Sequence, residues 1–150
     1  MKASALTTYL HDRIPLSRAM DVSAVVASAE QVVLEAPLDP NINVHGTMFG
    51  GSVATLGLLA AWSVLHLRLE TEGIANQLVI HRTAMEYLRP IEGCVRAAAQ
   101  LDPAGWDNFR HMLDRRSRAR LTIIAELLYD GQVAARLTGE FVAMLERKPA

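Results

Sequence analysis

The longest apolar stretch of the chain runs from Phe49 to Leu67 and contains no formally charged residue. A buried strand is much shorter than this, so the length predicts a helix. Because apolar residues occupy nearly every face of that helix, we expect it to be buried on all sides. Small residues recur along one stripe, which allows a backbone or a ligand to approach closely. They are Gly50, Ala54, Gly57 and Ala61.

At roughly 20 residues, the same stretch is about long enough to cross a bilayer. Small and polar residues interrupt it, however, and strand patterns flank it on both sides. The interruptions are Gly50, Gly51, Ser52, Thr55, Gly57, Ser63 and His66. We therefore expect the central element of a soluble domain, without a membrane partner.

Shorter patterns precede the central stretch. Residues Ser4 to Ile14 predict an amphipathic helix, which Pro15 ends. Residues Asp21 to Ser28 and Gln31 to Ala36 are rich in β-branched residues and partly alternate, which predicts two short strands. The two prolines and two asparagines between Pro37 and Gly46 indicate a loop.

After the central stretch, Glu72-Gly73 predicts a helix C-cap. Trp106, Phe109 and Leu113 are spaced three and four apart, which predicts a short helix within an insert from Asp102 to Ser117. Asp130-Gly131 is a strong hairpin signal. Four strand patterns accompany these signals, at Gln77–Leu88, Cys94–Leu101, Arg118–Tyr129 and Gln132–Leu145.

Two short strands, one buried helix and four longer antiparallel strands define an α+β architecture. The 150 residues form a single domain, 1–150, that is large enough for a real core. One flat sheet cannot cover a helix that is apolar on all sides. The sheet must curl around the helix, or a second subunit must cover it, or both.

Composition narrows the partners and the compartment. The net charge is −1, which gives no reason to expect nucleic acid or a membrane surface as a partner. The single cysteine, Cys94, excludes an internal disulfide framework, and we expect it in the core. The histidines show no metal-ligand spacing, so no metal is expected. The N-terminus lacks the apolar core of a signal peptide, which favours the cytoplasm.

Three short motifs carry a resemblance to a known family. They are Pro40-Asn41-Ile42-Asn43, then Thr47-Met48-Phe49 with Gly51-Ser52, and later Tyr87-Leu88 with Pro90. With the order of elements, they resemble the hotdog fold and, within it, the "putative thioesterase" hotdog family. That family includes stand-alone malonyl-acyl carrier protein decarboxylases, which this chain resembles most closely.

The resemblance implies an antiparallel sheet wrapped around the long helix, and subunits that pair as homodimers. Whether dimers pair further into tetramers stays open. It also implies substrates carried as thioesters on coenzyme A or on the phosphopantetheine of an acyl carrier protein, with no other cofactor.

The start of the central helix is the candidate substrate site. Unpaired amides at a helix N-terminus can stabilise a thioester oxygen as it gains negative charge. We expect the amides around Phe49, Gly50 and Gly51 to do so; alternatively, the glycines serve only the turn and the packing. The predicted substrate-binding residues are Asn41, His45, Gly46, Thr47, Met48, Phe49, Gly50 and Gly51.

The residues that hydrolysis needs are missing from their usual places. Many hotdog thioesterases start this helix with His-Gly-Gly and carry a carboxylate two turns later. Aligning Gly50-Gly51 with that pair puts Phe49 at the histidine position and Leu58 at the carboxylate position. Decarboxylation of a malonyl thioester needs no base, because the substrate already carries the charge. It needs a dry pocket and fixed donors near the carbonyl.

Asn43 is the predicted catalytic residue. In the decarboxylases of the family, the second asparagine of the Asn-x-Asn loop is implied to be critical, and a neutral amide donates without adding a base. Alternatively, Asn41 and Asn43 are turn residues whose side chains bind their own backbone. For Asn41 we favour that second interpretation. His45 is a candidate proton donor to the enolate or a plain loop residue.

Malonyl-carrier decarboxylation is therefore the expected function. The alternatives are an acyl thioesterase and a non-catalytic acyl-thioester-binding protein. Arg115, Arg116 and Arg118 form a basic run for an acidic carrier protein or its phosphopantetheine phosphate, which arginine pairs well; otherwise they are a solvated strand end. Tyr87 and Arg89 are candidates for a pocket at the dimer interface.

Overall fold

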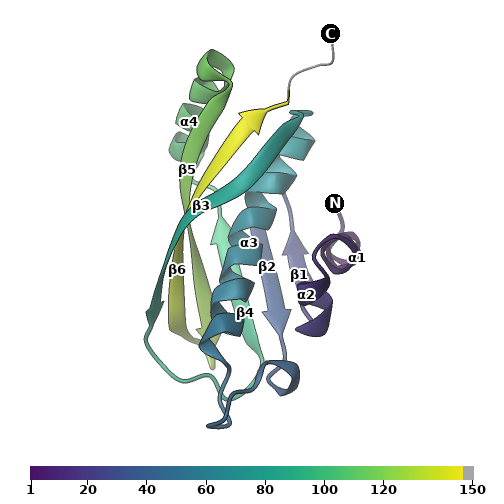
Figure 1. Cartoon of the computed structure of the whole chain (residues 1–150), viewed down its shortest axis with the longest axis vertical. Coiled ribbons are helices and arrows are strands. Elements are labelled where there is room, and N and C mark those ends of the chain that lie inside the picture. Colours follow the sequence, from purple (N-terminus) through teal and green to yellow (C-terminus); the bar gives the residue numbers. More distant parts are fainter. Residues whose placement is uncertain (147–150) are drawn as a thin grey trace.

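The computed structural model describes residues 1–146, and its central element is a helix of 22 residues, α3 (Gly50–Thr71). This helix lies along one face of a six-stranded antiparallel sheet that curls partly around it (Figure 1). The strand order is β1-β2-β4-β5-β6-β3. The strands are β1 (Ser23–Ala27), β2 (Gln31–Ala36), β3 (Asn76–Tyr87), β4 (Val95–Gln100), β5 (Arg118–Tyr129) and β6 (Gln132–Leu145).

Small residues allow the helix to approach the sheet closely. On β4 and β5 the inward positions include Ala97, Ala99 and Ala125, all buried. At Gly57 an added Cβ would lie 3.1 Å from Leu137 Cβ, which is tighter than ordinary side-chain contact. At Gly57, the sheet therefore packs closely against the predicted stripe of small residues.

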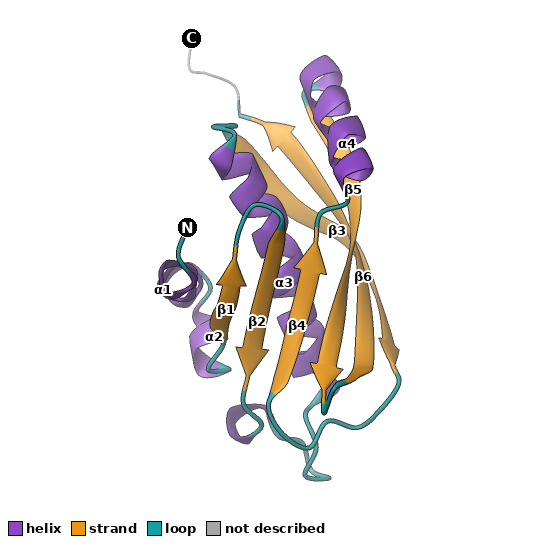
Figure 2. Cartoon of the chain, turned by 180° about the vertical axis from the view of Figure 1, so that it is seen from behind, coloured by secondary structure: helices purple, strands orange, loops and turns teal. Residues whose placement is uncertain are grey.

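The two edges of the sheet differ. Edge strand β1 is short, has a bulge between Ala24 and Val26, and packs against helix α1 (Ala3–Arg13) (Figure 2). The Ala24 N–H on this strand donates to Thr7 Oγ1 of α1 at 2.9 Å. At the opposite edge, β3 is 12 residues long and mostly exposed, and no described element pairs with its outer side.

One face of α3 is left partly open beside this edge. Leu58 and Trp62 are half-buried and, with Leu78, Val79 and Ile80, line an apolar cavity of 490 Å³. The expectation that α3 is buried on all sides is therefore wrong for a single chain. By length and composition this helix is apolar enough to cross a membrane, but 61% of its most apolar window is buried inside the fold.

The insert after β4 forms a helix, α4 (Pro103–Arg116), as predicted. The helix occupies nearly the whole insert. Asp102 Oδ2 caps it by accepting from the Gly105 N–H at 3.0 Å, and its apolar face is buried. Ser117 ends it in the left-handed region, with φ 59°. Arg115 and Arg116 therefore belong to the helix, and of the basic run only Arg118 lies on β5.

Most predicted boundaries agree with the structure to within about two residues, and three details differ. Pro15 opens a second helix, α2 (Pro15–Ala19), because the missing N–H of proline is harmless at a first helical position. A 3₁₀ turn, Asp39–Asn41, lies within the predicted loop. Cys94 is exposed just before β4, so its expected core position is wrong.

Candidate active site

Asn41 anchors the loop that leads into α3. Its side chain is 2% exposed, and Nδ2 donates to the carbonyl oxygens of Met20 at 2.9 Å and Pro37 at 2.8 Å. Its own carbonyl accepts from the Phe49 N–H at 2.8 Å. These bonds agree with the interpretation of Asn41 as a turn residue rather than a substrate ligand.

Asn43 closes the next turn with its side chain. Oδ1 accepts from the amides of His45 at 2.8 Å and Thr47 at 3.2 Å, and Nδ2 donates to Thr47 Oγ1 at 2.9 Å. A second donation from Nδ2, to the Met48 carbonyl, is long at 3.5 Å. The side chain therefore shapes the loop, and one amide hydrogen keeps only a weak partner. A catalytic role for Asn43 stays a prediction.

The start of α3 presents two free amides rather than three. The Phe49 N–H is bound to the Asn41 carbonyl, so the expected role of that amide is wrong. Within residues 1–146, neither the Gly50 nor the Gly51 N–H has a hydrogen-bond acceptor. These donors point away from a helix N-terminus that carries partial positive charge, which suits a developing oxyanion.

The Phe49 ring covers one side of this helix start. It is 57% exposed and lies so close to Gly51 that an added Cβ would be 2.3 Å from a ring carbon. Glycine at position 51 therefore permits this ring position. A larger residue there would force the ring to move.

A cavity of 360 Å³ opens beside the first turn of α3. The Tyr87 hydroxyl donates to the Gly50 carbonyl at 2.9 Å and ties the end of β3 to the helix start. Of the predicted substrate-binding residues, Met48 and Gly50 line this cavity. Its lining contains no Asp, Glu or His: Met48, Gly50, Val53, Tyr87, Leu88, Arg89, Pro90, Ile91 and Ala135.

Sequence reasoning missed part of this lining. Val53, Ile91 and Ala135 come from three separate elements, and no local pattern connects them. Tyr87, Leu88 and Pro90 were visible as the third motif of the resemblance, and Tyr87 and Arg89 as pocket candidates. The predicted residues His45, Gly46 and Thr47 form the turn of the loop and do not line the cavity.

The basic run lies at the far end of the molecule from this cavity. Arg118 pairs with Met144, which also pairs with Gln77 near the start of β3, whereas the cavity lies at the end of β3. The two ends of α3 are about 33 Å apart at 1.5 Å per residue. Within one chain, the structure does not bring the arginines and the helix start together (Figure 1).

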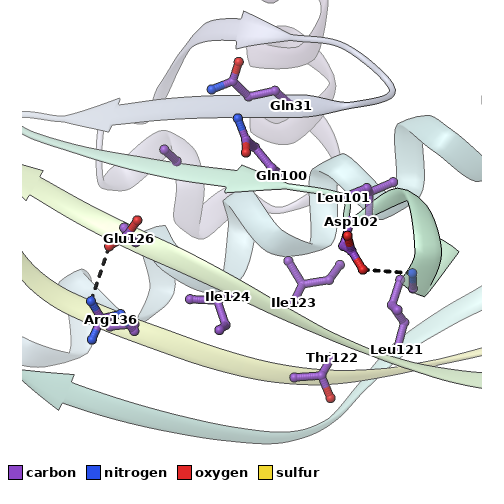
Figure 3. Close-up of a pocket in the computed structure, with 12 residues that line it drawn as sticks. Gln31, Gln100, Leu101, Asp102, Leu121, Thr122, Ile123, Ile124, Glu126 and Arg136 are labelled. Atoms are coloured by element: carbon purple, nitrogen blue, oxygen red, sulfur yellow. Dashed lines mark hydrogen bonds and ion pairs between the residues drawn. The ribbon is translucent and has the colours of Figure 1, made fainter.

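A second, larger cavity of 670 Å³ lies on the sheet where β4 ends and α4 begins (Figure 3). Gln31, Gln100 and Asp102 border it, and an ion pair between Arg136 and Glu126 at 3.4 Å lies at its other end. None of the predicted site residues lines it.

A long helix held by a curled antiparallel sheet, with free amides at its first turn, defines the hotdog fold of thioester-binding proteins. Residues 3–145 match the model of the family described as "Putative thioesterase (yiiD_Cterm)", and the chain belongs to this family. It is an enzyme family of thioesterase type, which implies acyl thioesters as substrates.

Solved structures agree with this assignment. A protein of unknown function from Chlorobaculum tepidum, OLEI01261, superposes with a TM-score of 0.90 at 26% identity, over 96% of this chain and 94% of that one. A "putative thioesterase" from Shewanella oneidensis gives 0.84 at 25% identity, over 95% and 96%. PA5026 of Pseudomonas aeruginosa, a probable thioesterase, gives 0.85 at 20% identity, over 97% of both chains, and shows the shared fold.

Proposed function

We propose that the protein decarboxylates a malonyl thioester, preferably on acyl carrier protein, and releases an acetyl thioester. One observation carries this proposal: Gly50, whose amide is free, lines the cavity at the start of α3 beside the second free amide of its neighbour Gly51, and the described lining contains no carboxylate or imidazole. Decarboxylation needs stabilisation of a developing enolate and no general base, whereas hydrolysis needs an activated water.

In the proposed reaction, the bond between the α-carbon and the carboxylate breaks and CO2 leaves. The electron pair of that bond forms the thioester enolate, whose oxygen receives hydrogen bonds from Gly50 and Gly51. The apolar walls formed by Met48, Val53 and Ile91 favour neutral CO2 over the charged carboxylate. A proton then reaches the α-carbon from water, or from His45 if the loop brings its ring to the cavity, giving the acetyl thioester.

A second candidate, hydrolysis of an acyl thioester, is favoured by the family to which the chain belongs. The same two amides suit the oxyanion of a tetrahedral intermediate. This reaction requires a base from outside the cavity described in one chain, for instance from a second copy. In both cases the acyl group arrives on coenzyme A or phosphopantetheine, and no further cofactor is needed. The proposed compartment is the cytoplasm.

The proposed assembly is a homodimer through the β3 edge. Val79 and Ile80 are 47% and 37% exposed there, next to the uncovered face of α3. Antiparallel pairing of β3 with its copy, about a two-fold axis near the middle of the strand, would set Tyr87 opposite the partner's Asn76. The partner's Arg118 would then lie three strand spacings away, about 14 Å. In such a dimer the basic run would lie near the cavity of the other subunit and could bind a carrier protein there.

Mass spectrometry of the products tests the function. The protein is incubated with malonyl-carrier protein and, separately, with malonyl-CoA. Acetyl thioester is the expected product. A free thiol with malonate would indicate hydrolysis instead of decarboxylation. Unchanged substrate at high enzyme concentration would indicate a binding protein without catalytic activity. Butyryl-carrier protein is the matched control substrate, because it can be hydrolysed but has no carboxylate to lose.

A further inference from the structure

Arg89 is an unpaired cation beside the candidate active site. Two arginines line the cavities described above, and Arg136 already pairs with Glu126. Arg89 has no carboxylate within 4.0 Å among residues 1–146. Since arginine stays charged at every physiological pH, this guanidinium is free to bind an anion.

The backbone around Arg89 is held firmly next to the helix start. The N–H groups of Leu88 and Arg89 both donate to the Ala134 carbonyl, at 2.8 and 3.0 Å. Two residues earlier, the Tyr87 hydroxyl binds the Gly50 carbonyl at 2.9 Å. The stem of Arg89 therefore leaves from a fixed point at the edge of the cavity, while its charged head remains exposed.

The remaining walls of the cavity, within residues 1–146, carry no charge. Met48, Val53, Leu88, Pro90, Ile91 and Ala135 are apolar. Arg89 is therefore the one charged residue in this described lining, and its charge decides the sign of the ligand that the cavity favours. A ligand that suits the whole cavity has a carbonyl oxygen for the free amide of Gly50, a short apolar body and one anionic group.

We infer that Arg89 binds an anionic group of the thioester at the mouth of this cavity and selects ligands by that charge. The inference rests on the proposed function insofar as it takes the ligand to be an acyl thioester. Two groups share the chemistry: the carboxylate of a malonyl-type acyl group and the phosphate of the pantetheine arm. Arginine pairs with either through two parallel hydrogen bonds.

The two sources predict different kinetics. An ion pair with the acyl carboxylate is lost as CO2 leaves, so it stabilises the substrate more than the transition state. Removing it would raise KM without lowering kcat. An ion pair with the arm phosphate persists throughout the reaction, so removing it would raise KM equally for every acyl group on the same carrier.

Direct binding to four stable analogues separates these cases. Each carries an amide in place of the thioester: malonyl and propionyl groups, each on coenzyme A and on pantetheine without phosphate. Calorimetry compares the wild type with Arg89→Gln and with Arg89→Lys, which keeps the charge. Lys2→Gln removes one exposed positive charge at the N-cap of α1, outside the cavity lining, and is the matched control.

We expect Arg89→Gln to weaken binding by about 10-fold for the analogues that carry the recognised anion, and Arg89→Lys to recover part of it. Loss with both malonyl analogues assigns the carboxylate, and loss with both coenzyme A analogues assigns the phosphate. Equal binding of all four by wild type and Arg89→Gln overturns the inference, as does an equal loss for all four. These readouts do not depend on turnover, so they stand even if no acetyl thioester forms.

Discussion

The side chain of Asn43 shapes the loop, and its proposed catalytic role would use the same side chain. Its side-chain oxygen accepts hydrogen bonds from two backbone amides. Its side-chain nitrogen donates to one acceptor at 2.9 Å and to a second at 3.5 Å. If the nitrogen also donates to the reacting thioester, loss of that donor matters most in the transition state. The loop bonds mean that truncation to alanine alone cannot separate the two roles.

Asn43→Asp separates them. The carboxylate keeps both bonds from His45 and Thr47, and the Thr47 hydroxyl can turn to donate to it, but the amide donor is gone. We expect Asn43→Asp to melt near the wild-type temperature and to lower kcat for malonyl thioester by about 10²–10³-fold. Asn43→Ala should lose as much activity and also some stability. Near-normal turnover by Asn43→Asp would reduce Asn43 to a turn residue.

His66 links stability to pH. Burial lowers the pKa of this histidine more than the nearby Glu70 raises it, and Nε2 has no hydrogen-bond partner among the described residues. Its ring stacks on Trp62, with centroids 4.6 Å apart, and on Tyr9 at 5.1 Å. Below pH 6.5 the unfolded chain therefore binds a proton more readily than the folded chain does.

This contribution to stability is complete above pH 6.5 and is lost as the pH falls through the lowered pKa of folded His66. We expect urea midpoints of the wild type to drop across that range. His66→Phe keeps the aromatic stack and should show a shallower drop. His111→Gln, at an exposed position on α4, should keep the wild-type slope. Identical slopes for all three proteins would contradict the assignment.

At the scale of elements, the edge strand β3 governs how α3 is covered. The other edge is shortened, bulged and bound by α1, which are common protections against edge-to-edge pairing. Strand β3 also has a bulge, between Ile80 and Arg82, but it is 12 residues long and no described element covers its outer side. It adjoins the apolar cavity beside Leu58 and Trp62. A second copy of β3 is the simplest cover for both.

Val79→Lys tests this edge. Full burial of a valine contributes about 1.5–3 kcal/mol, so a lysine there should raise the dimer Kd by at least about 10-fold. Val25→Lys is the matched control, because Val25 is 36% exposed on the opposite edge strand. Sedimentation at micromolar concentration measures both. A wild type that sediments as a monomer, or equal effects of the two changes, would argue against the β3 dimer.

At the scale of the whole molecule, the basic run lies far from the cavity of its own chain. The exposed arginines at the end of α4 and the start of β5 are one helix length from their own cavity. Charges at such a distance act on encounter with a charged partner rather than on bond breaking. These arginines would speed the association of an acidic carrier protein but not that of a small pantetheine substrate.

Replacing Arg115, Arg116 and Arg118 together by alanine should raise KM for malonyl-carrier protein by about 10-fold at low salt and flatten its salt dependence. The value for malonyl-pantetheine should stay unchanged, and this substrate is the internal control. Unchanged KM and salt dependence for the carrier substrate would identify these arginines as a solvated edge.

The sequence alone predicted the α+β class, the long helix, the strand boundaries and the helix in the insert. These features depend on hydrophobic periodicity, turn residues and caps, which act over a few neighbouring positions. The same local signals marked the loop, its asparagines and the paired glycines as the candidate site. They did not tell which amides stay free, because the Phe49 N–H is bound by a carbonyl eight residues away.

Only the tertiary structure decided which residues meet. Val53, Arg89, Ile91 and Ala135 surround one cavity because the sheet order sets β6 between β5 and β3 and the curl of the sheet brings β3 to the start of α3. The same order made β3 an open edge and put the basic run at the opposite end of the molecule. Such contacts depend on strand pairing and packing between distant segments, which no local pattern of residues encodes.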